Sequence, residues 1–188
     1  MGKGIDSLKL KKRSEKLSFM EVKPTTGSGE STFVRLEGFT TQTFNANAKE
    51  FTRQYVDEDT ERTDVTGYSE SINYNFDQYV GQKALEEIVK ISENELTGTD
   101  AVRKIVTVDM TTVKGEAGKT PFAGTATVRS YAIVPSSNGD TTDCMTYSGD
   151  FKARGAKSGC TVTLDDDFQT LTIAIGGNPI GGNPIGGK

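Results

Sequence analysis

The sequence contains no histidine and no tryptophan in its 188 residues. A chain without histidine lacks the commonest general base and the commonest metal ligand, and it cannot form a Ser-His-Asp triad. Two cysteines are too few for a structural zinc site. Acidic residues are plentiful, so counting alone leaves a paired-carboxylate hydrolase open, but such clefts commonly use aromatic platforms and tryptophan is missing. The composition therefore argues against an enzyme, and we expect no catalytic residue, no metal ligand and no cofactor.

Long apolar runs are also missing. No stretch approaches the roughly 18 apolar residues of a membrane span, and the first twenty residues lack the apolar run of a secretory signal. Cys144 and Cys160 are the only cysteines and form no CxxC pair. We expect unpaired thiols in a reducing compartment, with a disulfide between them as the alternative.

Charge is unevenly distributed along the chain. The net charge is −4, but seven basic and three acidic residues give residues 1–23 a charge of +4, which leaves −8 for the rest. An acidic body is a poor nucleic-acid binder, because phosphate contacts need lysine and arginine. The basic residues of the first segment include Lys9, Lys11, Lys12 and Arg13. Residues 1–15 are interpreted as a basic arm, either functional or merely a solvated lead-in to the first strand.

Two short motifs suggest ligand sites but lack required residues. In "GEAGKT" (Gly115–Thr120), a P-loop would need a glycine where Val113 stands and a helix where Pro121 follows. In "DEDTERTD" (Asp57–Asp64), a calcium loop would need glycine where Arg62 stands. An exposed turn and a solvated or partner-facing acidic cluster are the better interpretations.

Alternating apolar residues predict strands along most of the chain. The clearest feature is a long hairpin over residues 52–76. In its second arm Ile72, Tyr74 and Phe76 share one face, while Ser71, Asn73 and Asn75 share the other. The tip of this hairpin carries Asp57, Glu58, Asp59 and Glu61. The remaining predicted strands are 16–23, 32–40, 101–110, 121–136, 143–154, 160–165 and 169–175.

One helix is predicted, over about residues 78–93. Asp77 is a suitable N-cap and Gly98 a suitable stop. The apolar stripe that should be buried comprises Val80, Ala84, Leu85, Ile88 and Val89, with Leu96 as an extension. The residues expected to face water are Gln82, Lys83, Glu86, Glu87 and Lys90, with Glu86 and Lys90 as an i,i+4 ion pair.

The order of elements predicts a mainly β fold: a β-sandwich or partly closed β-barrel with one flanking helix. The helix should cover one sheet face and leave the other face and the edges available. We expect a single domain over residues 16–175. The repeat "IGGNPIGGNPIGGK" follows, and its glycine and proline content predicts a flexible tail over residues 176–188.

The layout as a whole resembles a known family. The acidic-tipped hairpin "TRQYVDEDTERTDVTGYSESINYNFD" runs directly into the single helix "QYVGQKALEEIVK", and a variable loop precedes "FAGTATVRSYAIV". This arrangement, over about residues 16–175, resembles the major tail tube protein of long-tailed (siphovirus-type) bacteriophages and of related prophage tail particles. No catalytic signature contributes to the resemblance.

The resemblance implies a structural protein of the virion tail, assembled in the host bacterial cytoplasm. It implies hexameric rings stacked into a hollow tube, through which DNA passes to the host without specific binding. The implied partners are other copies of the chain and the tape-measure, terminator and distal tail proteins. In that family the hairpin and the N-terminal arm contact neighbours, so we expect the acidic tip, Asp57 to Asp64, to meet the basic cluster Lys9 to Lys16. The alternative is a non-polymerising β-sandwich binding module, such as a tail-tip or carbohydrate-recognition domain.

Overall fold

A computed structural model describes residues 9–24, 31–116, 119–140 and 143–174. These residues form two compact units. Unit 1 is drawn from Met1–Leu36, Ile105–Val128 and Lys157–Lys188, and unit 2 from Glu37–Lys104 and Arg129–Ala156. The predicted flexible tail, 176–188, lies outside the described residues. The prediction of a single domain over 16–175 remains a prediction.

The described chain is mostly strand, with one α-helix. In chain order its elements are η2 (Arg13–Glu15), β1 (Lys16–Val22), β2 (Thr32–Arg35), β3 (Phe39–Asn45), β4 (Ala48–Arg53), β5 (Arg62–Tyr68), β6 (Ser71–Asp77), α1 (Lys83–Glu93), β7 (Val102–Asp109), η3 (Met110–Thr112), β8 (Lys114–Glu116), β9 (Lys119–Asp140), β10 (Met145–Leu164) and β11 (Thr170–Ala174).

Unit 1 is an antiparallel sheet in the order β10-β11-β2-β1-β7-β9-β8. Strand β1 lies between β2 and β7, with Phe19 opposite Arg35 on one side and Val106 on the other. The core of the unit is formed by apolar side chains that alternate along these strands. It comprises Phe19, Val106, Val108, Ala126, Val162, Leu164 and Leu171.

Unit 2 is built on the strand order β3-β6-β10. Strand β6 is antiparallel to both neighbours, with Asn73 opposite Thr43 of β3 and Asp150 of β10. Strand β9 pairs with β10 in addition to its other neighbours. This extra pairing partly closes the sheet into a ring, short of a complete barrel. The predicted fold class, mainly β and partly closed with one helix, is confirmed.

Stacked aromatic rings fill the buried face of β6 and its neighbours. Tyr74 stacks on Phe151 with ring centroids 4.4 Å apart, and Phe76 stacks on Tyr147 at 5.5 Å. Ile72, Tyr74 and Phe76 are buried, whereas Asn73 between them is exposed. Alternation along one strand therefore supplies both the core and the solvated face of this sheet.

Gly149 is required by the Tyr74 ring. The two residues lie directly opposite each other in the β6–β10 ladder. A Cβ atom built on Gly149 would lie 2.5 Å from both the Tyr74 hydroxyl and the backbone carbonyl of Val134. Because the backbone carbonyl cannot move aside cheaply, no side chain fits at this position.

The hairpin is longer than the predicted range 52–76. Its tip strands are β4 and β5, and the same two arms continue as β3 and β6, so the paired region runs from Phe39 to Asp77. Asn47, in the left-handed region at φ 44°, stands where one arm changes from β3 to β4. Tyr68, at the end of β5, is 63% exposed. The polar segment 45–51 concealed the first arm, because it lacks apolar alternation.

Two strand boundaries also differ from the prediction. The predicted strand 32–40 is divided into β2 and β3 around Gly38, whose φ of +80° favours glycine. The predicted strands 143–154 and 160–165 are parts of one long strand, β10, which continues through Gly155 at φ +88°. A glycine in a strand pattern can end a strand or bend it, and the sequence alone does not distinguish the two.

Helix α1 begins later than predicted. Its N-cap is Gln82, whose side-chain oxygen accepts from the N–H groups of Ala84 (2.7 Å) and Leu85 (3.2 Å). Asp77 is instead the last residue of β6, and Val80 is 97% exposed in the turn between them. The helix ends at Glu93 as predicted, with Asn94 rather than Gly98 at its C-cap.

The helix buries the central part of the predicted stripe. Ala84, Leu85, Ile88 and Val89 are all buried. Ile91, which the prediction left out, is buried as well, whereas the predicted extension Leu96 is half-buried and lies beyond the end of the helix. The apolar stripe therefore anchors α1 within unit 2.

Glu87 is buried, although it was expected to face water. Its Oε1 accepts from Arg103 Nε at 2.9 Å and contacts a second guanidinium nitrogen, and both side chains are less than 7% exposed. Arg103 also donates to the carbonyls of Asp100 and Val102, each at 2.7 Å. Lys90 approaches Glu87 at 4.0 Å, so the expected Glu86–Lys90 pair is replaced by this one. The ion pair connects α1 to the start of β7.

Substitution of Ile88 by aspartate should destabilise unit 2. Ile88 is 1% exposed, so Ile88→Asp places an unpaired carboxylate in an apolar site and should cost about 3 kcal/mol or more. Lys83→Asp is the matched control, because Lys83 is exposed and a carboxylate is favourable in the first turn. Urea unfolding measures both variants. Equal midpoints for Ile88→Asp and the wild type would contradict the packing of α1.

Removal of Arg103 should cost more than removal of the whole ion pair. Arg103→Met leaves the Glu87 carboxylate buried without its main partner, and we expect a loss of about 3–5 kcal/mol in the free energy of unfolding. The double variant Arg103→Met, Glu87→Leu should recover most of that loss, since no charge remains buried. The same denaturation measurement compares the two. A double variant less stable than Arg103→Met would overturn this account.

Candidate functional site

The solvated face of unit 2 carries a ladder of amides and hydroxyls. Across β3, β6 and β10, the Asn45 amide donates to Asn73, and the Asn73 amide donates to Asp150. Lys152 completes the row with an ion pair to Asp150 at 2.8 Å. The Asp150 carboxylate is thus bonded on both sides, and the row has no net charge.

A second polar row lies beside the first on the same face. Register places Thr41, Asn75 and Ser148 side by side, and the Ser148 hydroxyl is 2.7 Å from that of Ser137 on β9. Strand β3 has β6 as its one sheet neighbour among the described residues. Its outer edge therefore presents backbone N–H and C=O groups that can pair with another strand.

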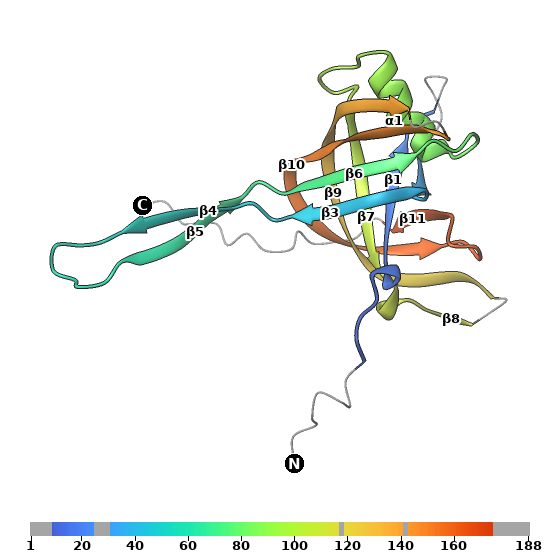
Figure 1. The fold of residues 1–188 in the computed structure, drawn as a ribbon. Helices are drawn as coiled ribbons and strands as arrows, with labels where there is room; N and C mark the ends of the chain where they lie inside the picture. The colour runs from blue at the N-terminus through green and yellow to red at the C-terminus, as the bar shows by residue number, and fades with distance from the viewer. Residues whose placement is uncertain (1–8, 25–30, 117–118, 141–142, 175–188) are drawn as a thin grey trace. The chain divides into compact units, whose positions relative to one another are not determined.

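The β4–β5 hairpin is exposed along its length and projects beyond β3 and β6 of the same unit (Figure 1). It carries five of the ten large apolar side chains that are exposed in the described chain. These are Phe51, Tyr55, Val56, Val65 and Tyr68. An isolated two-stranded ribbon has little stability by itself in water, so a surface of this kind favours contact with another molecule.

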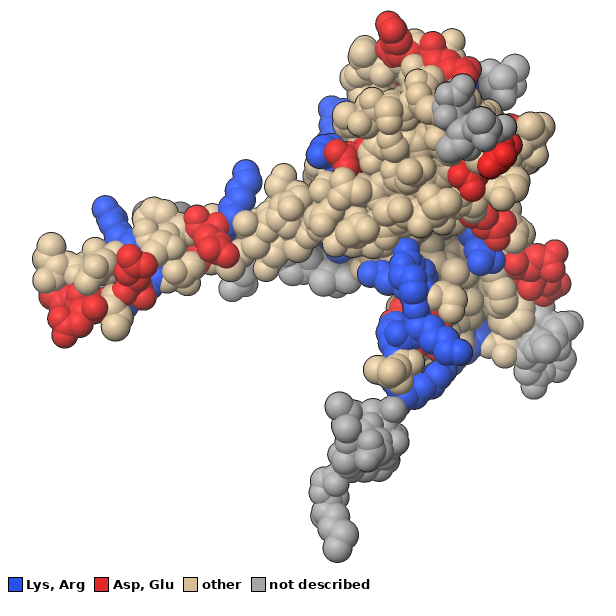
Figure 2. Space-filling model, in the orientation of Figure 1, with Lys and Arg blue, Asp and Glu red and all other residues tan. Residues whose placement is uncertain are grey.

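Acidic side chains gather at the tip of the hairpin (Figure 2). Glu58 forms an ion pair with Arg62, and the guanidinium groups of Arg53 and Arg62 lie 5.8 and 6.0 Å from the centroid of the Tyr55 ring. The two arginines therefore order the base of the tip. Asp57, Asp59 and Glu61 are exposed.

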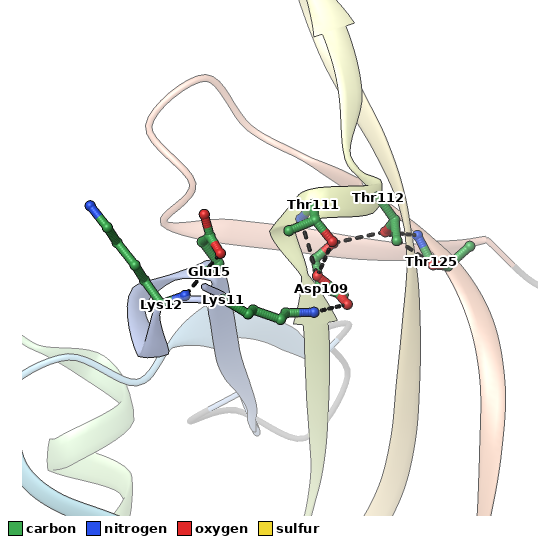
Figure 3. Close-up of polar contacts among 7 residues, drawn as sticks. All are labelled: Lys11, Lys12, Glu15, Asp109, Thr111, Thr112 and Thr125. Carbon is green, nitrogen blue, oxygen red and sulfur yellow. Dashed lines mark hydrogen bonds and ion pairs between the residues drawn. The ribbon is translucent and has the colours of Figure 1, made fainter. Parts of the chain in front are cut away.

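The basic arm of unit 1 is held by two acidic side chains. Lys9 Nζ donates to Glu15 Oε1 at 2.8 Å, and the backbone N–H of Lys12 donates to Glu15 Oε2 at 3.0 Å (Figure 3). Lys11 forms an ion pair with Asp109, at the end of β7. The Arg13 guanidinium donates to the carbonyl of Lys16 at 2.8 Å. Of these contacts, the Lys11–Asp109 pair joins the segment to β7, while residues 9–14 are exposed.

Asp109 connects the arm to a set of threonines. Its Oδ1 accepts from the Thr111 hydroxyl at 2.6 Å and from the Thr111 N–H at 3.1 Å (Figure 3). The Thr112 hydroxyl donates to the Asp109 carbonyl at 2.8 Å and lies 3.0 Å from that of Thr125. The Lys11 ammonium, followed by the Thr111 hydroxyl, lowers the pKa of Asp109 to about 2.

A shallow pocket lies next to this network, entirely within unit 1. Its volume is about 510 Å³, and it opens widely to solvent. Three lysines, three threonines, one aspartate and one alanine line it. The lining residues are Lys11, Lys16, Thr107, Asp109, Thr125, Ala126, Thr127 and Lys157. A pocket with three cations and one anion attracts negatively charged groups.

The sequence-derived contact residues fall into these two regions. The tip residues Asp57 to Glu61 belong to unit 2, and the arm residues Lys9, Lys11, Lys12 and Arg13 belong to unit 1. Their pairing between copies remains a prediction. Sequence reasoning missed Lys157, which lies far along the chain from the arm. The sequence signal available for the pocket was that Thr107 and Asp109, like Thr125 and Thr127, are two positions apart and so share one face of a strand.

The rejected ligand motifs lie on strands or on the hairpin. Strands β8 and β9 occupy Lys114–Glu116 and Lys119–Asp140, so a strand follows the Gly-Lys-Thr motif. Among the described residues, no group of three or more histidine, cysteine or acidic side chains is placed to hold a metal ion. Within the same ranges, no helix has the length and hydropathy to cross a bilayer. No disulfide joins Cys144 and Cys160.

Comparisons with known proteins give little further information. No protein-family model and no curated protein matches the chain. Among solved structures, a chain in the six-fold symmetrised cryo-EM structure of the anti-feeding prophage baseplate matches with a TM-score of 0.44 and 7% identity. The match covers 77% of this chain and 91% of that chain. Similarity at this level leaves the function to be argued from the residues.

Replacement of Lys11 should raise the pKa of Asp109. In the wild type the carboxyl should titrate near pH 2, because the neighbouring cation stabilises its charged form. In Lys11→Met the midpoint should move up toward the ordinary value of about 3.9, with Thr111 preventing a full return. In the wild type, the contribution of the charged Asp109 carboxylate to stability is present above pH 4 and is lost as the pH falls toward 2. Carboxyl carbon NMR measures the midpoint; Lys12→Met is the control and should leave it unchanged.

Proposed function

We propose that this protein is a non-catalytic structural subunit of a bacteriophage or prophage tail, which assembles as stacked hexameric rings into the tail tube. The observation that carries the proposal is the construction of unit 2. Its sheet has a packed aromatic face, a polar face and an open edge at β3. The resemblance of the sequence layout to tail tube proteins supplies the six-membered ring and the tube.

The open edge of β3 supports assembly through backbone pairing. An exposed edge strand invites uncontrolled association unless it is covered, and a closed ring of subunits covers every edge. Its side chains on the polar face, Thr41, Thr43 and Asn45, offer no charge that would repel a partner strand. Edge-to-edge pairing in a ring would join the sheets of neighbouring subunits into one continuous wall.

The polar face is suited to line a channel for DNA. Its two rows consist of amides and hydroxyls, with the single cation Lys152 paired to Asp150. Binding of phosphate depends on cationic side chains, so a wall of neutral polar groups allows the duplex to pass without being held. The neutrality of the two rows thus gives the wall a low affinity for phosphate.

The proposed setting follows from the tube. The subunit acts in the virion tail after assembly in the bacterial cytoplasm, with tape-measure, terminator and distal tail proteins as its neighbours. The lumen must admit duplex DNA, which sets its width on the order of 20–40 Å.

Negative-stain electron microscopy of the purified protein tests the proposal. We expect hollow tubes or six-membered rings at neutral pH. A protein that stays monomeric at every concentration and salt tested, and is not found in tubes of particles that contain it, would contradict the proposal. Affinity for glycans in such a monomer would support the non-polymerising binding module instead.

Proline substitutions on β3 test the edge-pairing step. Consecutive N–H groups of a strand point to opposite sides, so one of Gln42→Pro and Thr43→Pro removes a bond to β6 and the other alters the open edge. We expect one variant to lose thermal stability. The other should keep the wild-type melting temperature and fail to form rings. Normal rings from the stable variant would contradict assembly through β3.

A further inference from the structure

The pocket of unit 1 is a feature that the proposed function has not used. Strands β1, β7, β9 and β10 supply most of its lining residues, and Lys11 comes from the segment before η2. Lys16 and Lys157 are exposed at its surface, and Lys11 is positioned by Asp109. An ammonium group has three N–H donors, so a lysine already bonded to one acceptor can bind a second.

The volume and polarity of the pocket indicate a carboxylate-bearing turn rather than a small ion. A space of about 510 Å³ is within the range of sites for ligands much larger than a single phosphate. Threonine hydroxyls on neighbouring strands add donors that suit several oxygen atoms at once.

The β4–β5 tip has the complementary properties. It presents Asp57, Asp59 and Glu61 within five residues, all of them exposed, at the end of a projecting hairpin. Arg53 and Arg62 stack on Tyr55 and hold the base of the turn. The turn therefore loses less conformational entropy when it docks. The tip can therefore enter a shallow pocket that a flat acidic surface could not reach.

We propose that the acidic tip of the β4–β5 hairpin of one copy docks in the Lys11–Lys16–Lys157 pocket of a second copy. This inference rests on the proposed function for its setting and adds the site of contact. It narrows the expected partner, the Lys9–Lys16 cluster, to Lys11 and Lys16, and adds Lys157 of β10 and three threonines. The contact is head-to-tail, since tip and pocket are different surfaces, and it can therefore extend through many copies.

Charge reversal provides the test. The tip variant carries Asp57→Lys and Asp59→Lys, and the pocket variant carries Lys16→Glu and Lys157→Glu. Each alone should raise the protein concentration needed for association by about tenfold or more, which corresponds to about 1.4 kcal/mol per decade. A 1:1 mixture of the two should associate again, because each acidic tip meets a basic pocket and each basic tip an acidic one.

Matched controls place the same charge changes elsewhere. Asp166→Lys with Asp167→Lys reverses an exposed acidic turn, and Lys83→Glu with Lys104→Glu reverses two exposed lysines. Both should associate like the wild type. Zero-length carbodiimide crosslinking of mixed ¹⁴N and ¹⁵N protein supplies a second readout. We expect crosslinks from Lys16 or Lys157 to Asp57 or Asp59 that join one labelled and one unlabelled chain.

The outcomes distinguish this inference from the proposed function. Rings and tubes that form equally well from both reversed variants would overturn the docking contact and leave the tube function standing. Interchain crosslinks and rescue by mixing, without any rings, would support the contact and remove the tube function. If every crosslinked peptide pair carries one isotope alone, the crosslinks lie within single chains, and this result would overturn the contact between copies. Salt-dependent binding of duplex DNA that is lost in the pocket variant, with association unchanged, would assign the pocket to nucleic acid instead.

Discussion

The pairing of β6 with β3 on one side and β10 on the other is the constraint on which unit 2 depends. It fixes the direction of every side chain on β6, so that Tyr74 and Phe76 enter the core while Asn73 and Asn75 meet water. The aromatic stack and the polar ladder are consequences of the same register. The projecting β4–β5 ribbon is a continuation of the β3–β6 ladder beyond the core.

Much of this fold could be predicted from alternation. The buried residues of β6, the apolar stripe of α1 and the strand character of β1, β7 and β11 all follow from local periodicity. Local periodicity failed to predict strand boundaries next to glycines. Gly38 ends a strand and Gly155 lies within one, and only the neighbouring strands decide between these outcomes.

The polar residues were harder to place than the apolar ones. Glu87 has the sequence context of a solvent-facing helix residue, but Arg103, sixteen positions later, supplies the buried partner that changes its environment. Asp77 is a good cap by residue type, yet the β6–β10 ladder includes it as a strand residue and leaves the capping to Gln82. The candidate pocket could not be assembled from sequence, because Lys157 reaches it only through the sheet order.

The close fit of Gly149 against Tyr74 has a consequence for how the chain folds. A slip of β10 by two residues would keep its polar and apolar faces correct, so alternation by itself does not prevent it. Such a slip would place Tyr147 or Phe151 opposite Tyr74, at a position where even a methyl group meets the Val134 carbonyl. The close fit at Gly149 thus disfavours both two-residue slips of β10. The polar–apolar pattern would tolerate several alignments of β10 with β6, and the observed one places the glycine opposite Tyr74.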